Sequence, residues 1–179
     1  MLAATKLCRE RGLDVPFLVL LYTTIDALAW AAYGEATTDT RQRFIQFCED
    51  HILPGRDFTC TALELYAARC STLHSLGWAS TLSDSGKARS AFYSFGTDDP
   101  ATALAAFEHS HPGKFFAIRA DVLHEAVATA YSKVKRLAQS DTALAKRLRT
   151  AEGKQYRSLE SKTGDELFLN YLNAAGKKS

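Results

Sequence analysis

The chain has 179 residues, of which 46% are hydrophobic and 23% are charged, and its formal net charge is +2. This length and composition are typical of a globular chain with a sizeable core and exclude a wholly disordered one, while so small a net charge does not by itself indicate a nucleic-acid partner. The four cysteines form no Cys-x-x-Cys pair and have no histidine at zinc-finger spacing, so we expect reduced thiols, no metal site and a cytoplasmic protein.

The first strong pattern is an almost wholly apolar helix, predicted over residues 15–33 and ended by Gly34. A helix that is apolar on nearly every side belongs at the centre of a bundle. Its 19 residues approach the length of a membrane span, but Asp26 argues against one, so no membrane partner is expected. The first six residues also lack the basic tip and uninterrupted apolar core of a signal peptide.

Two amphipathic helices are predicted next. Threonine or aspartate at 37–39 can cap the first, in which apolar residues recur three or four apart until Pro54. The second begins with a capping box, in which Thr61 and Glu64 each satisfy a backbone N–H group of the other residue, and it runs to Gly77.

For the next part of the chain, the sequence leaves several kinds of secondary structure open. Residues 80–96 are compatible with a loop, a strand, a short helix or a hairpin near 87–96. Asp99 and Pro100 then open a fourth helix, and a long fifth helix is predicted over 114–139.

The C-terminal third is basic, with nine lysines and arginines against three acidic residues between 131 and 162. This run is compatible with a solvated helix face or with a phosphate-binding face. Asp141 can cap a helix that reaches Gly153, and Thr163 with Glu166 forms a capping box for a last helix. The whole chain, 1–179, is therefore predicted to be a single all-α domain of up to seven helices.

Arg69 and His74 lie on the third predicted helix with four residues between them. Arginine supplies a permanent cation and histidine a group that titrates near neutral pH, and together they suit cleavage of a phosphodiester. Arg119 and His124 have the same spacing inside the predicted fifth helix, so they form an alternative pair.

The surroundings of Arg69 add two expectations. Asp26 is the only charge in the apolar helix and would be costly to bury alone, so Arg69 is its natural partner. Five residues along an α-helix rotate a side chain by about 140°. We therefore expect one helix alone to make a poor site and a two-fold homodimer to assemble it.

Thr24-Ile25-Asp26-Ala27-Leu28 on an apolar helix, followed by a helix with Tyr66-Ala67-Ala68-Arg69-Cys70-Ser71-Thr72-Leu73-His74, resembles the HEPN superfamily over residues 15–77. Its members share an arginine, four to six intervening residues and a histidine on a late helix. The resemblance implies an up-and-down helical bundle, with residues 80–179 as a family-specific helical extension. It further implies a metal-independent endoribonuclease, usually dimeric, of the kind found in toxin–antitoxin systems and phage defence.

Carried over onto this chain, the family's catalytic residues are Arg69 and His74. The resemblance implies RNA as substrate, 2′,3′-cyclic phosphate and 5′-hydroxyl products, and an inhibitor or antitoxin protein as a further partner. Asp26, Tyr66 and Cys70 are supporting residues: Tyr66 adds a hydroxyl near the phosphate or simply packs. Cys70 stands where many active members carry asparagine or aspartate, which leaves open a non-catalytic helical module that binds nucleotide, RNA or protein.

Other chemistry finds less support in the sequence. His109 and His111 beside Glu108 lack a convergent set of metal ligands. Glycine-rich phosphate loops and a serine-centred nucleophile elbow do not occur, and no cofactor is expected.

Overall fold

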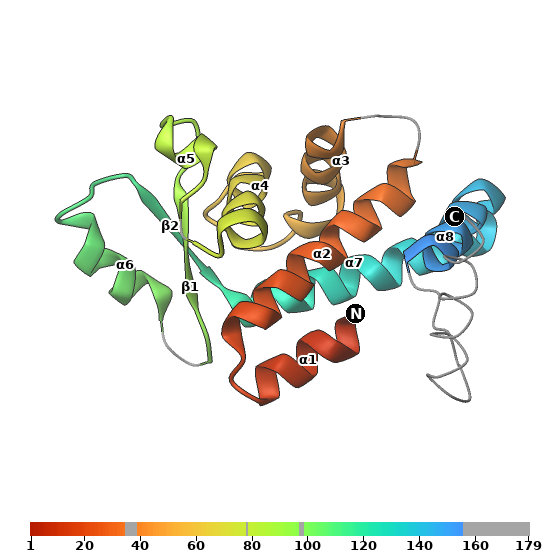
Figure 1. Cartoon of the computed structure of the whole chain (residues 1–179), viewed down its shortest axis with the longest axis horizontal. Helices are drawn as coiled ribbons and strands as arrows, with labels where there is room; N and C mark the ends of the chain where they lie inside the picture. Colours follow the sequence, from red (N-terminus) through yellow and green to blue (C-terminus); the bar gives the residue numbers. More distant parts are fainter. Residues whose placement is uncertain (35–38, 78, 97–98, 156–179) are drawn as a thin grey trace, which may run out of the picture. The chain divides into compact units, whose positions relative to one another are not determined.

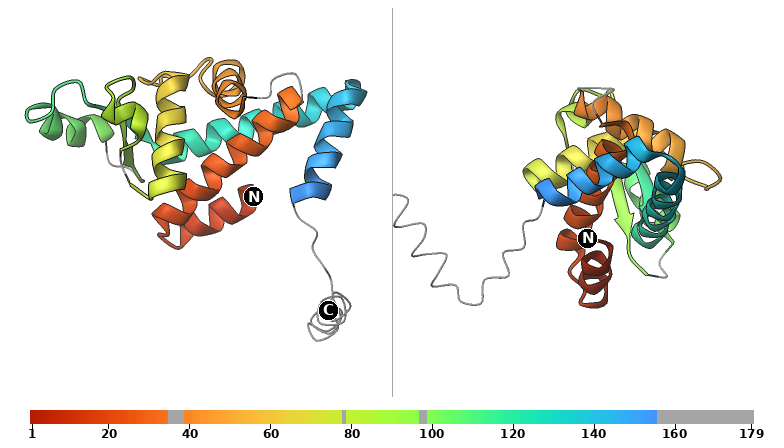
Figure 2. Two further views of the ribbon diagram at one scale, coloured as in Figure 1. Left: turned by 45° about the horizontal axis from the view of Figure 1, so that its top comes forward. Right: turned by 90° about the vertical axis from the view of Figure 1, so that its right-hand side faces the viewer.

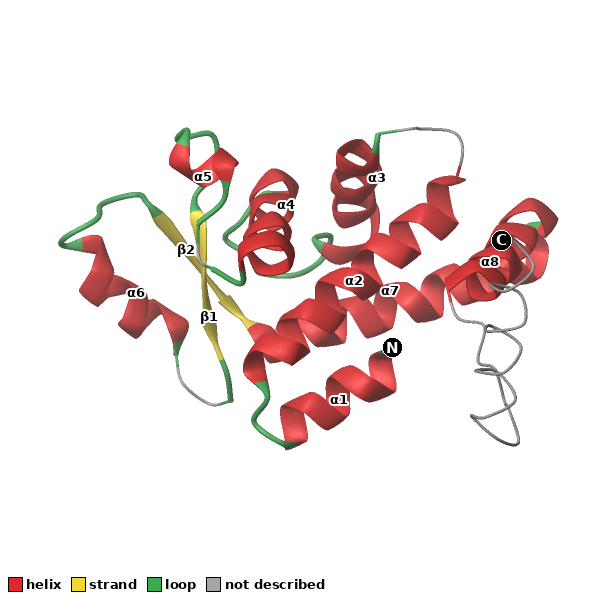
Figure 3. Ribbon diagram, in the orientation of Figure 1, coloured by secondary structure: helices red, strands yellow, loops and turns green. Residues whose placement is uncertain are grey.

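The computed structural model describes residues 1–34, 39–77, 79–96 and 99–155. The chain divides into two compact units, Met1–Leu148 and Arg149–Ser179, and the fold given below is that of the first. The structure is 70% helical, and its described residues form eight α-helices and one two-stranded sheet (Figures 1 and 3).

The elements in chain order are α1 (Leu2–Glu10), α2 (Asp14–Tyr33), α3 (Thr40–Phe47), η2 (Cys48–Ile52), α4 (Ala62–Cys70), η3 (Ser71–Ser75), α5 (Thr81–Asp84), β1 (Ser90–Ser94), α6 (Pro100–Glu108), β2 (Phe115–Arg119), α7 (Ala120–Ser140) and α8 (Thr142–Gln155). Here η denotes a π-helical turn. The two π turns continue α3 and α4 without a break, so each of these helices ends in a wider turn than it began with.

The apolar helix α2 lies at the centre of the fold, as its composition predicts. It packs against α1, α3 and α7 (Figure 2). The side chains of Phe17, Leu21, Tyr22 and Ile25 are fully buried. Its length and hydropathy would suffice for a membrane span, yet half of the apolar window is buried inside the fold. Burial in a protein core is sufficient to explain why this helix is apolar all round.

The end of α2 is fixed by a side chain from the basic C-terminal run. Gly34 ends the helix with φ of 52°, and Arg147 donates hydrogen bonds to the carbonyl oxygens of Ala31 and Ala32, both at 3.1 Å. A cation at a helix C-terminus satisfies carbonyl groups that lack an intrahelical partner. This arginine therefore has a structural role, and the phosphate-binding interpretation of the run does not extend to it.

The predicted helix starts are confirmed wherever the capping residue is described. Asp39 accepts from the N–H of the second residue of α3, and Asp99 does the same for α6. Thr61 and Glu64 form the full capping box of α4. Asp141 accepts from the N–H of Leu144 at 2.9 Å. The capping residues proposed at 37, 38, 163 and 166 lie outside the described residues.

The prediction of a mainly helical fold is confirmed, except that a small parallel sheet also forms. Residues 115–119, predicted as the start of a long helix, are strand β2, and α7 begins only at Ala120. Burial alternates along β2, with Phe116 and Ile118 inside, as a strand with one buried face requires. The partner is β1 in parallel register, Ser90 opposite Phe115, with α6 as the crossover. The alternative of a hairpin near 87–96 is therefore wrong, whereas a short helix, α5, and a strand, β1, both occur within 80–96.

Helix α1 was not predicted, and it packs along α2. Helix α4 lies between α3 and the strand β1 and contacts both (Figure 1). This placement sets α4 against α3 on one side and the sheet on the other, while the π turn η3 that continues α4 contacts α2. These contacts fix the segment that carries Arg69 and His74.

Candidate functional site

The side chains of Arg69 and His74 meet within one chain. Arg69 Nη1 lies 3.0 Å from His74 Nε2, and His74 is exposed to solvent. The expectation that a single helix would hold these two residues apart is therefore wrong. The two-fold partner is not needed to bring the guanidinium and the imidazole together.

The physical reason is the π turn η3, Ser71–Ser75. In a π turn the bonds run from residue i to residue i+5, so residues five apart come into line where an α-helix would rotate them away from each other. The N–H of Leu76 donates to the carbonyl of Ser71, and the N–H of Gly77 donates to the same oxygen at 3.3 Å. Leu76 then ends the helix in the left-handed conformation, with φ of 49°.

Asp26 holds the guanidinium from the opposite side, as the sequence predicts. Arg69 Nε and Nη2 donate to Asp26 Oδ2 at 2.9 and 2.7 Å. The two side chains are 15% and 21% exposed, so the ion pair is largely shielded from water. Asp26 Oδ1 is buried and has no hydrogen-bond partner among the described residues. Burial raises the pKa of Asp26 despite the opposing effect of Arg69.

Arginines from α3 add positive charge around Asp26 and Tyr66. The guanidinium of Arg41 lies 5.9 Å from the centre of the Tyr66 ring, and that of Arg69 lies 6.0 Å from it. Arg43 contributes an electrostatic effect that lowers the pKa of Asp26. Sequence reasoning missed Arg41 and Arg43, although two arginines in the first turn after a capping aspartate were visible as a signal.

Tyr66 and Cys70 line the same region in different roles. The Tyr66 ring packs edge-on against Phe44 at 5.6 Å and supports the two guanidinium groups. Burial and the neighbouring Cys70 raise the pKa of the Tyr66 hydroxyl. Cys70 is a half-buried free thiol. The packing alternative for Tyr66 thus has direct geometric support.

The alternative pair is not brought together. Arg119 is the last residue of β2 and donates to the carbonyl of Gly96 at 3.4 Å. His124 lies on α7, where its Nε2 is 3.0 Å from the Thr5 hydroxyl and its ring packs against Phe17. Identical spacing in sequence therefore gives two unrelated environments, because the first residue of this pair is in a strand and not in a helix.

Within the described part of the chain, no group of three or more histidine, cysteine, aspartate or glutamate side chains could hold a metal ion. Comparisons of the sequence and the structure with protein-family models, curated proteins and solved structures gave no match. The interpretation of the site therefore depends on its own geometry: an exposed imidazole, a guanidinium in contact with it, and a largely shielded carboxylate behind.

Proposed function

We propose that this chain is a metal-independent endoribonuclease with a HEPN-like fold, in which Arg69 and His74 are the catalytic residues. One observation carries the proposal: an exposed imidazole touches a guanidinium at 3.0 Å, and Asp26 fixes that guanidinium from behind. Positioning of both groups before substrate arrives is what acid–base catalysis on a phosphodiester needs.

RNA carries its own nucleophile, the 2′-hydroxyl, so cleavage requires a proton acceptor at that oxygen and a cation at the phosphate. Arginine can only donate, so His74 Nε2 accepts the bond from Arg69 and the ring proton resides on Nδ1. In the proposed reaction a phosphate oxygen replaces His74 Nε2 as the acceptor of the hydrogen bond from Arg69 Nη1. His74 Nε2 is then free to accept the 2′-hydroxyl proton.

The 2′-oxygen forms its bond to phosphorus while the bond from phosphorus to the 5′-oxygen breaks. The 5′-oxygen takes up a proton, and the products are a 2′,3′-cyclic phosphate and a 5′-hydroxyl end. In a homodimer, the state that the HEPN likeness implies, His74 of the partner subunit supplies that proton; in a monomer, water does. Arg69 neutralises the charge that develops on the phosphorane.

A second candidate is a non-catalytic module that binds RNA, nucleotide or protein. It is favoured by the bonding of Arg69, since Nε and Nη2 are both engaged by Asp26 and only Nη1 faces His74. A guanidinium held in this way also suits a purely structural ion pair.

The two candidates are separated by incubating purified protein with single-stranded and structured RNA in the presence of a chelator. We compare wild type with His74→Ala and Arg69→Ala, and use His124→Ala as the matched control. Cleavage that is lost in the first two variants and kept in the third supports the proposal. Cleavage that survives both substitutions contradicts the site, and RNA binding without any cleavage favours the binding module.

Expression in cells gives a second readout of the proposed role as a toxin or defence protein. We expect growth inhibition that His74→Ala relieves and His124→Ala does not. Equal toxicity of all three proteins would contradict a toxic nuclease activity.

A further inference from the structure

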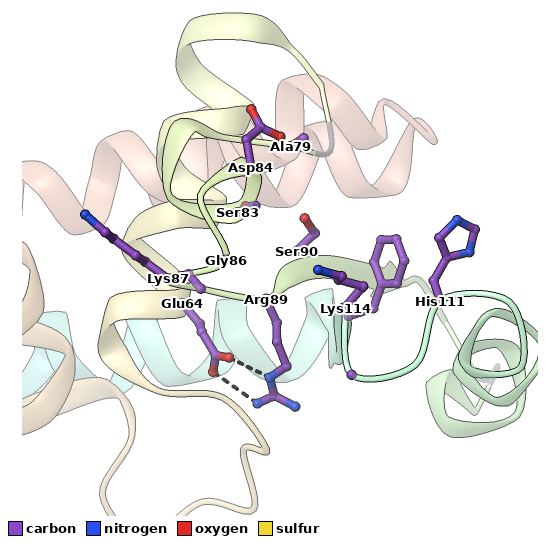
Figure 4. A pocket seen from close by; sticks show the side chains of 13 residues that line it. Glu64, Ala79, Ser83, Asp84, Gly86, Lys87, Arg89, Ser90, His111 and Lys114 are labelled. Carbon is purple, nitrogen blue, oxygen red and sulfur yellow. Dashed lines mark hydrogen bonds and ion pairs between the residues drawn. The ribbon is translucent and has the colours of Figure 1, made fainter.

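A cavity of about 460 Å³ lies where the two parallel strands begin. Its walls come from α4, from the loop between α5 and β1, and from the segment that leads into β2 (Figure 4). This volume is in the range of small-molecule sites. Glu64, which lines it, precedes Arg69 by five residues on α4, a rotation of about 140°. The cavity therefore faces away from the Arg69–His74 site.

One wall of the cavity is a closed ion pair. Arg89 Nε and Nη2 donate to the two carboxylate oxygens of Glu64 at 2.5 and 3.1 Å (Figure 4). Arg89 Nη2 also donates to the carbonyl of Thr59 at 2.7 Å. Because the two charges cancel, this pair gives the wall its shape and leaves the net charge of the cavity to other residues.

The remaining charged side chains of the cavity are Lys87, Lys114 and Asp84, with the imidazole of His111 beside them. Figure 4 shows the ammonium group of Lys114 extending toward Ser90, while Asp84 projects from α5 on another side and Lys87 extends away from Lys114. Lys114, an exposed residue, is thus the lysine of the cavity whose ammonium group extends toward Ser90.

Ser90 is a buried polar residue that lines the same space. It is only 6% exposed, and its N–H donates to the carbonyl of Lys114 at 2.9 Å, which fixes the two residues relative to each other. The backbone bond leaves both side chains free to face a ligand. Phe115 and the alanines at 79 and 88 supply an apolar wall on the remaining sides.

We propose that this cavity binds a small phosphate monoester, with the Lys114 ammonium and the Ser90 hydroxyl as contacts to the phosphate. A compact ammonium beside a hydroxyl donor suits phosphate oxygens, and the apolar wall suits an organic group such as a nucleoside. The inference is independent of the proposed nuclease activity, because it uses none of that site's residues.

The test is isothermal titration calorimetry with AMP, inorganic phosphate and adenosine. We expect saturable binding of AMP, weaker binding of phosphate and no binding of adenosine. Lys114→Gln should weaken AMP binding at least about tenfold and Ser90→Ala about threefold. The matched control is Lys133→Gln, which removes an exposed lysine of α7 outside the cavity and should change the affinity by less than about twofold.

Three results would overturn the proposal: no saturable AMP binding, adenosine binding as tight as AMP, or equal losses in the Lys114 and Lys133 variants. If Lys114→Gln does not fold, the test uses the wild-type protein instead: AMP is added, and the changes in the NMR chemical shifts of its backbone amides are mapped. Shifts centred on 83–90 and 111–115 support the site, and shifts elsewhere refute it. AMP binding that persists in His74→Ala would show that the cavity binds its ligand independently of the proposed nuclease site.

Discussion

Helix α4 carries two arginine–carboxylate pairs that differ in how completely they are bonded. At its start, the oxygens of Glu64 accept from the N–H and hydroxyl of Thr61 and from Arg89. At its end, Asp26 accepts from Arg69 through Oδ2 alone, while Oδ1 is buried without a partner among the described residues. The pKa values of the two carboxyls follow this difference.

Burial acts on both carboxyls, but with opposite outcomes. For Glu64 the bonds from Arg89 and Thr61 outweigh burial, and the pKa lies below its usual value. For Asp26 burial outweighs Arg69, and the pKa lies above it. The first pair is thus built for stability, whereas the second is incompletely satisfied beside an exposed imidazole, an arrangement typical of functional sites.

The largest effect is expected from Arg69→Lys. Lysine keeps the charge but lacks the planar fork that contacts Asp26 and the phosphate together, so RNA cleavage should fall at least about 100-fold. Arg89→Lys is the matched control and should leave cleavage within about twofold while lowering stability. Initial cleavage rates at saturating protein compare the two, and equal losses would remove the functional distinction between the pairs.

Glu64→Gln should be the most destabilising change at either carboxylate. It breaks the bonds to Arg89 and weakens the capping box, so we expect a loss of about 2 kcal/mol in the free energy of unfolding. Urea titration followed by circular dichroism measures this. A loss smaller than that caused by Asp26→Asn would invert our ranking of the two pairs.

Asp26→Asn should change stability by less than about 1 kcal/mol, because a neutral amide avoids the cost of burying a charge and partly offsets the lost ion pair. Cleavage should nevertheless fall about tenfold, since Arg69 loses its fixed orientation. We expect Asp26→Glu to recover part of the rate. Full activity of Asp26→Asn would show that the carboxylate does not position the arginine.

The smallest expected difference between the two pairs is in how the free energy of unfolding depends on pH. The Glu64 carboxyl, with a lowered pKa, contributes stability above its ordinary value of 4.5 that is lost as pH falls through the folded-state pKa. The Asp26 carboxyl, with a raised pKa, contributes stability below its ordinary value of 3.8 that is lost as pH rises through the folded-state pKa. Relative to wild type, Glu64→Gln should lose less stability on acidification and Asp26→Asn more. Unfolding free energies from about pH 3 to pH 7 test this, and parallel curves would refute it.

Features that act over a few residues could be predicted from the sequence. The caps at Asp39, Thr61, Asp99 and Asp141 were found because a capping side chain bonds the backbone two or three residues away. The Asp26–Arg69 contact was found because a lone charge in an apolar helix needs a partner.

Apart from the Asp26–Arg69 contact, whose residues lie 43 positions apart, features that depend on distant partners could not be predicted. Residues 115–119 are apolar and short, so their pattern fits a strand or a buried helix until β1 is known to pair with them. The π turn at Ser71–Ser75 has no distinguishing local composition, and it decided the geometry of the site.

The π turn also predicts how an insertion or deletion between Arg69 and His74 would change their contact. Removing Leu73 would leave one fewer residue between arginine and histidine, and regular α-helical winding would then bring the two side chains together as neighbours four positions apart. A shorter spacer and tighter winding can therefore compensate each other. In this chain, the number of residues between Arg69 and His74 has to be considered together with the winding of the helix that carries them.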